Sequence, residues 1–214
     1  MARFIPKVEM TGTFAELLAA PGVEETSTLR SSRLGFMAYH GGEVEKVTDV
    51  IAADAALRSG ASCYGVTQSI EPIRHLASTR VDPAESEQLA TFLTHVDAVI
   101  TIHGYGLKTE GTAILVGGQN RVLAHHVAKH LRAGLDEYEV IDELDDIPKQ
   151  LRGQHSRNPV NLPPQRGAQI ELPPSIRWNA EGRHWSDFGN DGRAPDTEAL
   201  VAALAAAASE WMRD

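Results

Sequence analysis

The sequence has 214 residues, with 20 lysines and arginines against 29 aspartates and glutamates, so its formal charge is −9. Hydrophobic residues make up 42% and charged residues 23% of the chain, which excludes a disordered chain and a membrane protein. The acidic balance argues against nucleic-acid binding, because phosphate-binding surfaces need clustered lysine and arginine.

Short apolar runs alternate with longer amphipathic stretches, a pattern typical of α/β folds. The predicted strands are Leu34–Tyr39, Ala61–Val66, Ile73–Ala77, Ala98–Ile102, Ala113–Val116 and Gln169–Leu172. The predicted helices are Val44–Ser59, Glu85–Val96, Gln119–Ala133 and Thr197–Met212. Between them, Asp142–Asp146 predicts a solvated loop and helix start, and the Pro-, Asn- and Arg-rich segment Gly153–Arg166 predicts an ordered loop.

No repeat or long linker divides the chain, so we expect a single domain over residues 1–214. No apolar run reaches the ~18 residues of a membrane span. The first ten residues, MARFIPKVEM, lack the continuous apolar core of a signal peptide. These observations predict a soluble, cytoplasmic protein without a membrane partner.

Two histidines follow apolar strands and precede glycines: His40 in HGG and His103 in IHG. The carboxyl ends of strands are where ligand sites gather in α/β folds, so the two side chains can meet in one crevice. Glu45 lies five residues after His40, in the expected first turn of the next helix. Two histidines and a glutamate that leave a fourth position for water form the ligand pattern of catalytic zinc.

The same residues have a simpler interpretation, which the spacing leaves open. A histidine at a strand end often serves in capping or packing, and a glutamate in a first helical turn interacts favourably with the helix dipole. The HxxxxE spacing is also far less diagnostic of a metal than HExxH.

Four segments together resemble the poly-γ-glutamate hydrolase family, a group of phage- and bacteria-borne enzymes related to zinc carboxypeptidases. The resemblance covers roughly residues 30–178, and HGG-x-x-E combined with IHG is its most specific part. The segments are FMAYHGGEVEKVTDVIA (Phe36–Ala52), AVITIHGYG (Ala98–Gly106), LVGGQNRVLAHHVAKHLRAG (Leu115–Gly134) and RGAQIELPPSIR (Arg166–Arg177).

The resemblance implies a three-layer α/β/α sandwich with a mixed central sheet and one Zn²⁺ held by His40, Glu45 and His103. It also implies that Glu171, in the Gln-x-Glu-Leu strand, is the acid–base residue that moves a proton from the attacking water to the leaving nitrogen. Without the resemblance, Glu171 would read as a solvent-facing carboxylate on a short edge strand. The sequence departs from the family at Glu43, where members often carry a glycine or another small residue.

A glutamyl or peptide-like substrate presents carboxylates, which arginine binds in a bidentate fork. Arg157 and Asn158 are the first candidates for substrate binding, because an Asn–Arg cluster before the catalytic strand resembles the carboxypeptidase arrangement. Arg177 and Arg80 are further candidates, and Tyr105 is placed to contact substrate or oxyanion. For any one of these arginines a surface ion pair is an equally good interpretation.

Other motifs give weaker predictions. No G-x-S-x-G, GxxxxGK[ST] or GxGxxG occurs, which argues against esterase, phosphate and dinucleotide sites. The single cysteine, Cys63, is expected to be buried and unreactive. His126 and His130 stand four apart on a predicted helix, a spacing that permits a shared metal but more often marks a solvated face.

Three functions remain open at this stage. The first is a zinc-dependent hydrolase of γ-glutamyl bonds. The second keeps the zinc site but acts on peptides, peptidoglycan fragments or N-acyl amino acids, and the −9 charge favours it because a long polyglutamate would be repelled. The third is a non-catalytic zinc-binding protein on the same fold.

Overall fold

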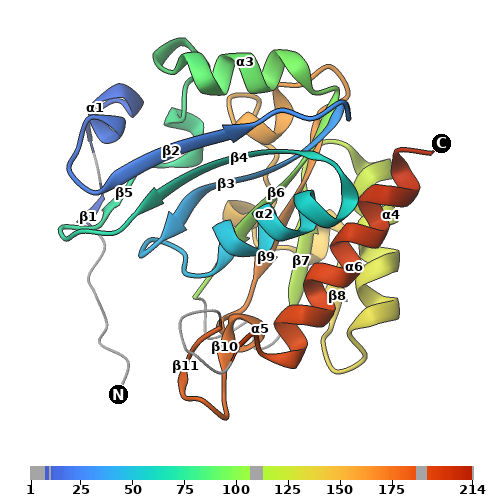
Figure 1. Cartoon of the computed structure of the whole chain (residues 1–214). Coiled ribbons are helices and arrows are strands. Elements are labelled where there is room, and N and C mark those ends of the chain that lie inside the picture. The colour runs from blue at the N-terminus through green and yellow to red at the C-terminus, as the bar shows by residue number, and fades with distance from the viewer. Residues whose placement is uncertain (1–7, 10, 107–112, 187–191, 214) are drawn as a thin grey trace.

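The computed structural model describes residues 8–9, 11–106, 113–186 and 192–213. A seven-stranded sheet runs through the molecule in the order β2-β4-β3-β6-β9-β7-β8 (Figure 1). Its strands are β2 (Val23–Thr28), β3 (Leu34–Gly42), β4 (Ser62–Gln68), β6 (Ala98–Gly104), β7 (Ile114–Gly117), β8 (Val140–Ile141) and β9 (Gly167–Leu172).

The sheet is mixed. The central strands β4, β3, β6 and β9 pair in parallel, while β2 pairs antiparallel with β4 and β7 antiparallel with β9. At the far edge β8 pairs in parallel with β7. The carboxyl ends of the four central strands therefore lie at one edge of the sheet, where ligand sites form in such folds.

Helices cover both faces of the sheet, so the molecule has the predicted three layers (Figure 1). Helices α2 (Thr48–Ser59), α4 (Arg121–Gly134) and α6 (Pro195–Trp211) bury their apolar sides against one face. Helices α1 (Phe14–Leu18) and α3 (Glu87–His95) pack on the other face. The alternation of strand side chains explains both cores, because Ile100 and Ile102 face the first layer and Val99 faces the second.

Short elements complete the described chain. They are the two-stranded pairs β1 (Val8–Glu9) with β5 (Arg74–His75) and β10 (Trp178–Asn179) with β11 (His184–Trp185), the helix α5 (Pro174–Arg177), and the 3-10 helices η1 (Ser78–Arg80), η2 (Pro83–Glu85), η4 (Leu144–Asp146), η5 (Lys149–Leu151) and η6 (Pro159–Asn161). None of the described helices is both long and apolar enough to span a bilayer.

The structure corrects several predicted elements. The helix expected from Val44 begins at Thr48, because Glu45 N bonds back to His40 O in a turn and Val47 has a positive φ of 75°. Glu45 therefore precedes the helix instead of lying in its first turn. The strand predicted for Ile73–Ala77 is reduced to the two residues of β5, and the predicted loop Gly153–Arg166 contains the helix η6.

The edge strand β2 and the helix α1 were not predicted. In β2 the segment VEETST alternates between half-buried and exposed positions and has one apolar residue, so it carries no hydrophobic signal. Tertiary pairing with β4 makes it a strand. In contrast, β9 is an interior strand, buried along its whole length, and the edge-strand interpretation of Glu171 is wrong.

Candidate active site

A cavity of about 1000 Å³ opens at the carboxyl ends of β3, β6 and β9. His103 on β6 and Glu171 on β9 are register partners in parallel strands, so their side chains project from the same face of the sheet. His40, Glu45, His103 and Glu171 all line this cavity and are all buried. The structure thus brings the four predicted residues to one place.

A bulge near the end of β3 directs His40 into the cavity. Between Ala38 and Gly41 the strand advances three residues while its partner β4 advances two. This extra residue breaks strict alternation, so that neighbouring Tyr39 and His40 both reach the site. The turn that follows requires glycine, since Gly42 has a φ of +64° and a Cβ there would lie 2.4 Å from Gln68 O.

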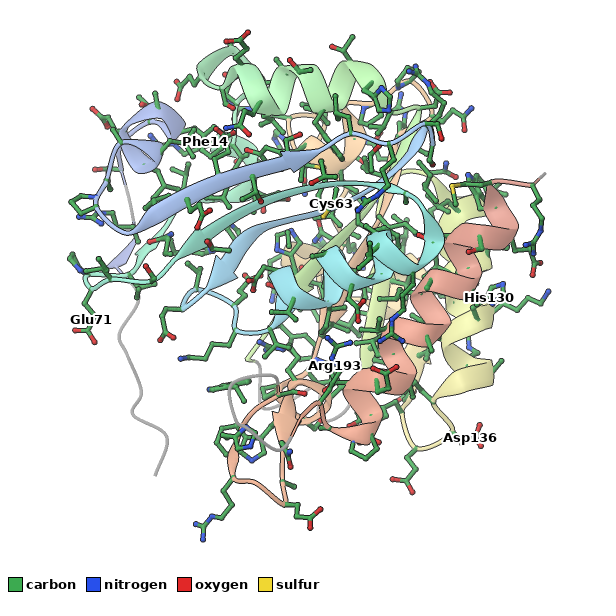
Figure 2. The ribbon with its side chains drawn as sticks, viewed as in Figure 1. Phe14, Cys63, Glu71, His130, Asp136 and Arg193 are labelled. Carbon is green, nitrogen blue, oxygen red and sulfur yellow. The ribbon has the colours of Figure 1, made fainter. Side chains whose placement is uncertain are left out.

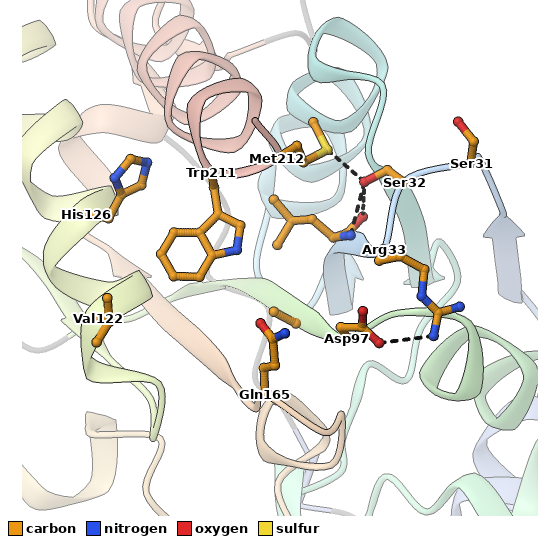
Figure 3. Close-up of a pocket in the computed structure, with 11 residues that line it drawn as sticks. Ser31, Ser32, Arg33, Asp97, Val122, His126, Gln165, Trp211 and Met212 are labelled. Carbon is orange, nitrogen blue, oxygen red and sulfur yellow. Dashed lines mark hydrogen bonds and ion pairs between the residues drawn. The ribbon is translucent and has the colours of Figure 1, made fainter. Parts of the chain in front are cut away.

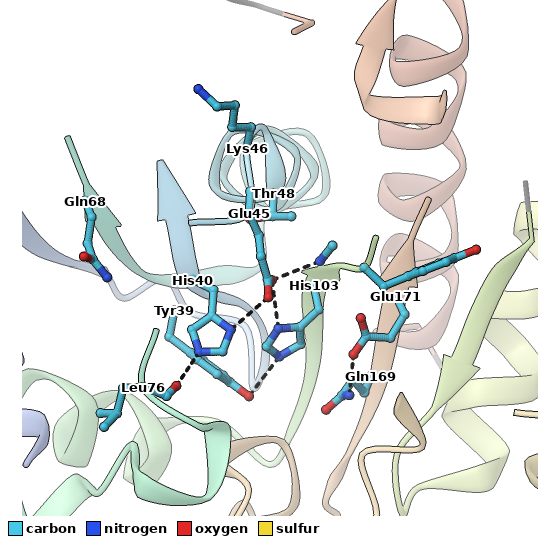
Figure 4. Close-up of polar contacts among 12 residues, drawn as sticks. Tyr39, His40, Glu45, Lys46, Thr48, Gln68, Leu76, His103, Gln169 and Glu171 are labelled. Carbon is cyan, nitrogen blue, oxygen red and sulfur yellow. Dashed lines mark hydrogen bonds and ion pairs between the residues drawn. The ribbon is translucent and has the colours of Figure 1, made fainter. Parts of the chain in front are cut away.

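The carboxylate of Glu45 lies between the two histidine rings (Figure 4). Its Oε1 is 3.1 Å from His40 Nδ1, and its Oε2 is 3.1 Å from His103 Nδ1. The backbone N–H of Gly104 also donates to Oε2, at 2.9 Å. One carboxylate therefore connects the HGG and IHG segments.

The outer nitrogens of both rings have fixed partners. His40 Nε2 lies 2.8 Å from the Leu76 carbonyl oxygen, which only accepts, so this nitrogen carries the proton. His103 Nε2 lies 3.0 Å from the hydroxyl of Tyr39, whose own proton is donated to Asn158 Oδ1 at 2.9 Å. Both Nε2 atoms are thus donors, an arrangement that orients metal-binding histidines and sets their tautomer.

The donor set fits a metal ion. With Nε2 protonated, a neutral ring turns its Nδ1 lone pair toward a Glu45 oxygen, and both atoms are acceptors. A cation bound by these three residues would replace two repulsive contacts with ligand bonds, and two imidazoles with one carboxylate suit Zn²⁺. Protonation of both rings would satisfy the same contacts, which makes metal content the deciding measurement.

Two opposing effects act on the pKa of Glu45. Burial would raise the pKa of this carboxyl, but the imidazoles of His40 and His103 outweigh it and hold the pKa well below its usual range. In contrast, burial raises the pKa of the Tyr39 hydroxyl, which therefore keeps its proton and remains a donor. Glu45 is an anion in the folded protein, as a ligand must be.

A continuous chain of hydrogen bonds leads from His103 to Glu171. Beyond Tyr39, Asn158 Nδ2 donates to Gln169 Oε1 at 2.8 Å, and Gln169 Nε2 donates to Glu171 Oε1 at 2.8 Å. All the donors point in one direction, and the Glu171 carboxylate is the final acceptor. The chain fixes Glu171 relative to His103 through side chains alone.

Tyr39 and Gln169 were missed by sequence reasoning. Gln169 lies two positions before Glu171 and therefore on the same face of β9. That spacing was a usable signal. Nothing in the sequence indicates that Tyr39 contacts His103, because the two are 64 residues apart and meet only through the sheet.

His75 is a further residue that spacing did not predict. Its ring centroid lies 4.8 Å from that of His40, and it lines the cavity. Ligand atoms of His40, Glu45 and His75 all lie within 4.8 Å of one another, so His75 is an alternative third ligand to His103. The short parallel pairing of β5 with β1 places it there.

The predicted substrate-binding residues fall into different surroundings. Asn158 and Tyr105 line the cavity and are buried, and the Tyr105 hydroxyl donates to Ala113 O at 2.6 Å. Arg157 is exposed and is not among the residues that line the cavity. Arg80 is exposed as well, and its guanidinium donates to the backbone carbonyls of Thr11 and Gly12.

Arg177 is buried behind the cavity and ties its two ligand-bearing loops together. Its guanidinium donates to Lys46 O at 2.9 Å and Tyr105 O at 3.3 Å, carbonyls that follow Glu45 and His103. The guanidinium also occupies the space beside Gly104, where a Cβ would lie 2.6 Å from Arg177 Cζ. Burial lowers the pKa of Arg177 to about 10, so the side chain stays charged at neutral pH.

Replacing Arg177 with Met should lower the free energy of unfolding by about 2–4 kcal/mol, because buried carbonyl groups lose their donors. Urea denaturation of the metal-free protein measures this loss. The exposed Arg157→Met is the matched control and should change stability by no more than about 0.5 kcal/mol. Equal stability of the two variants would contradict the assigned role of Arg177.

Two other expectations concern residues outside the cavity. Cys63 lies within the sheet (Figure 2) and is half-buried, less than predicted. Burial raises the pKa of its thiol to about 11, which disfavours the reactive thiolate at neutral pH. Glu43, where the sequence departs from the family, pairs with Lys46 at 2.6 Å and is not among the residues that line the cavity.

Comparison with known proteins identifies the family. A sequence profile described as poly-γ-glutamate hydrolase matches residues 13–187, well over half of the chain. The chain belongs to the poly-γ-glutamate hydrolase family. As a member of this family it is a hydrolase of amide bonds, so the predicted family and enzyme class are confirmed. A search of curated proteins finds no match.

Solved structures share the fold of this family member. A bacteriophage poly-γ-glutamate hydrolase is similar with a TM-score of 0.74 at 18% identity, over 89% of each chain. The zinc-free form of YNDL has a TM-score of 0.67 at 19% identity, over 87% of this chain and 89% of its own. N-formylglutamate amidohydrolase from Ralstonia eutropha JMP134 has a TM-score of 0.55 at 12% identity, over 91% and 99%. The predicted α/β sandwich is confirmed.

Proposed function

We propose that this poly-γ-glutamate hydrolase family member is a zinc-dependent enzyme that cleaves γ-glutamyl or similar peptide-like amide bonds. His40, Glu45 and His103 are its proposed zinc ligands, and Glu171 is its proposed acid–base residue. The observation that carries the proposal is the position of the Glu45 carboxylate, 3.1 Å from the Nδ1 atoms of both histidines. Glu171 projects from the same face of the sheet as His103.

When bound, zinc would polarise the scissile carbonyl and lower the pKa of water to about 7. The remaining chemistry belongs to the chain. Glu171 accepts a proton from the attacking water and delivers it to the leaving nitrogen, so that the C–N bond breaks as the C–O bond forms and the nitrogen departs as a neutral amine. The hydrogen bond from Gln169 Nε2 to Glu171 Oε1 orients the carboxylate for this transfer.

The wall of the cavity supports a substrate of amide or glutamyl type. Asn158 and Tyr105 are placed along it, and Lys149 adds an exposed cation at its rim. A cation at the rim can pair with a substrate carboxylate while the side chain keeps its hydration. Arg157 stays a proposed contact of the substrate from the neighbouring loop. Arg177 contributes to the site only by holding the loops that carry Glu45 and His103.

The alternative substrates keep the same zinc site. Lys149 is the one lysine or arginine among the described lining residues, and the whole chain carries a formal charge of −9. Both facts favour a short substrate with one or two carboxylates over a long polyanion, whose approach the acidic surface would slow. Peptides, peptidoglycan fragments and N-acyl amino acids therefore remain the second candidate class.

A comparison of substrates tests the proposed function. Zinc-loaded protein is incubated with poly-γ-glutamate, a short γ-glutamyl peptide, an α-linked glutamyl peptide and N-formylglutamate, and amine release is measured. We expect kcat/KM for the γ-linked compounds to exceed that for the α-linked peptide by at least about tenfold. Activity confined to the α-linked or acyl compounds would transfer the proposal to the second class. A stoichiometric zinc without turnover on any compound would identify a binding protein.

A further inference from the structure

Two histidines of α4 and a glutamate of α6 form a cluster outside the cavity described above. His126 and His130 are four residues apart and so lie on one side of α4. Glu210 comes from the last turn of α6, which packs along α4. Ligand atoms of the three side chains all lie within 4.8 Å of one another. Figure 2 places His130 on α4 beside α6.

The ring of His126 is oriented for metal binding. Its Nε2 lies 2.9 Å from the carbonyl oxygen of Ala207, which only accepts, so Nε2 carries the proton and Nδ1 carries the lone pair. A carbonyl bound to one ring nitrogen is the usual support of a ligating histidine. The centroid of the His126 ring lies 4.9 Å from that of His130.

His130 contributes a polar atom without a hydrogen bond. Its Nε2 is buried and makes no hydrogen bond within the described part of the chain. It lies 3.4 Å from Glu210 Oε2, an ion-pair separation. Burial lowers the pKa of His130, and the neighbouring His126 lowers it further, which favours the neutral ring that a metal ligand requires.

Another cluster of the same residue types lacks these properties. His125, Asp142 and Glu143 also place their ligand atoms within 4.8 Å. However, the Asp142 carboxylate already pairs with Arg132 at 2.5 Å and with His125 at 2.8 Å. A cation at this carboxylate would have to displace the guanidinium. The contacts of this cluster are satisfied by the protein itself, unlike the buried Nε2 of His130.

We infer that His126, His130 and Glu210 bind a divalent transition metal and thereby link α6 to α4. Two imidazoles and one carboxylate suit Zn²⁺, and the same ligands bind Cu²⁺ more tightly. The site adjoins a pocket of about 800 Å³ that His126 and Trp211 line (Figure 3). That pocket also includes Leu34 and Ala98, the first residues of β3 and β6, so it lies at the opposite edge of the sheet from the candidate active site.

The test measures zinc binding in the full chain after the proposed active-site zinc ligand His103 has been removed. Isothermal titration of metal-free His103→Ala with Zn²⁺ should give one site per chain, and His103→Ala with His130→Ala should give none. Glu210→Gln should weaken binding at least about tenfold, since the anionic ligand is lost. His125→Ala, on the same helix but outside the cluster, should bind as before. Equal titration curves with and without His130→Ala would overturn the inference.

Trp211 supplies a second readout that does not depend on activity. Its ring centroid lies 5.5 Å from that of His126, so Cu²⁺ at the cluster should quench its fluorescence. The quench should disappear in Trp211→Phe, which still binds Cu²⁺, and in His126→Ala, which does not. A quench that survives His126→Ala would contradict the site.

Thermal unfolding separates loss of the site from loss of the fold. At a free zinc concentration ten times Kd, binding raises the ratio of folded to unfolded protein about 11-fold. This rise should occur in His103→Ala and be absent when His130→Ala is added, while both metal-free proteins unfold cooperatively. His130→Asn, a polar replacement, replaces His130→Ala if the latter unfolds. Because the compared proteins share the His103→Ala background, a zinc effect that depends on His130 is independent of the proposed function.

Discussion

Replacing Glu171 with Gln is expected to lower kcat by about 10²–10⁴-fold while zinc content remains unchanged. The replacement keeps the size of the side chain and the oxygen that accepts from Gln169 Nε2, but it cannot accept a proton from water. KM should change little, because the buried position on β9 is preserved. Initial rates of amine release and metal analysis of the same samples measure both effects.

Glu43→Gln is the matched control, since it neutralises a carboxylate that pairs with Lys46 and is not among the residues lining the cavity. Its kcat should stay within about a factor of two. Turnover retained by Glu171→Gln would remove Glu171 as the acid–base residue. Loss of zinc in that variant would instead make Glu171 a participant in metal binding.

Replacing His103 with Ala should remove about one zinc per chain relative to the unchanged protein and abolish hydrolysis. Two ligands, His40 and Glu45, cannot complete the three-ligand set of a catalytic zinc site. The change also removes one of the two imidazoles that lower the pKa of Glu45, so its pKa rises toward the normal range. A carboxyl group whose pKa is lower in the folded than in the unfolded protein stabilises the fold at pH values above its unfolded pKa. This stabilisation is lost as the pH falls through the folded-state pKa. The metal-free variant should therefore gain less stability as pH rises.

Two further variants test the choice of ligand. His75→Ala removes the alternative third ligand and should keep the zinc if His103 is the ligand. Tyr39→Phe keeps all three ligands but removes the hydroxyl that accepts from His103 Nε2, and should weaken zinc affinity about 10–100-fold. Loss of about one zinc per chain from His75→Ala, together with an unchanged zinc content in His103→Ala, would assign the third position to His75.

Local sequence signals account for the elements that build the centre of the sheet. The strands β3 and β6 begin with predominantly apolar runs, which are typical of buried parallel strands, whereas β9 is interrupted by Gln169 and Glu171. The edge strand β2 was not predictable, because VEETST has no apolar face and becomes a strand only by pairing with β4. The late start of α2 depends on a turn that returns Glu45 N to His40 O.

The residues of the candidate site also fall into two groups, those that the sequence indicates and those that only the fold brings there. His40 and His103 follow apolar strands and precede glycines, which the chain shows directly, whereas Glu171 was predicted only through the family resemblance. His75 and Tyr39 carry no such mark, and Gln169 is indicated only by its spacing of two residues from Glu171. They enter the site because β5 pairs with β1, because β3 is bulged, and because Asn158 bridges the hydroxyl of Tyr39 to the amide of Gln169.

By itself the sequence determined the α/β class, the buried central strands and the family, since these depend on apolar runs and on short motifs within the chain. Only the tertiary structure decided that Glu45 lies between two rings, that Arg177 holds the loops behind them and that His126 and His130 meet Glu210. These contacts join residues up to 131 positions apart. Their geometry depends on strand register and helix packing, which no local pattern of residues specifies.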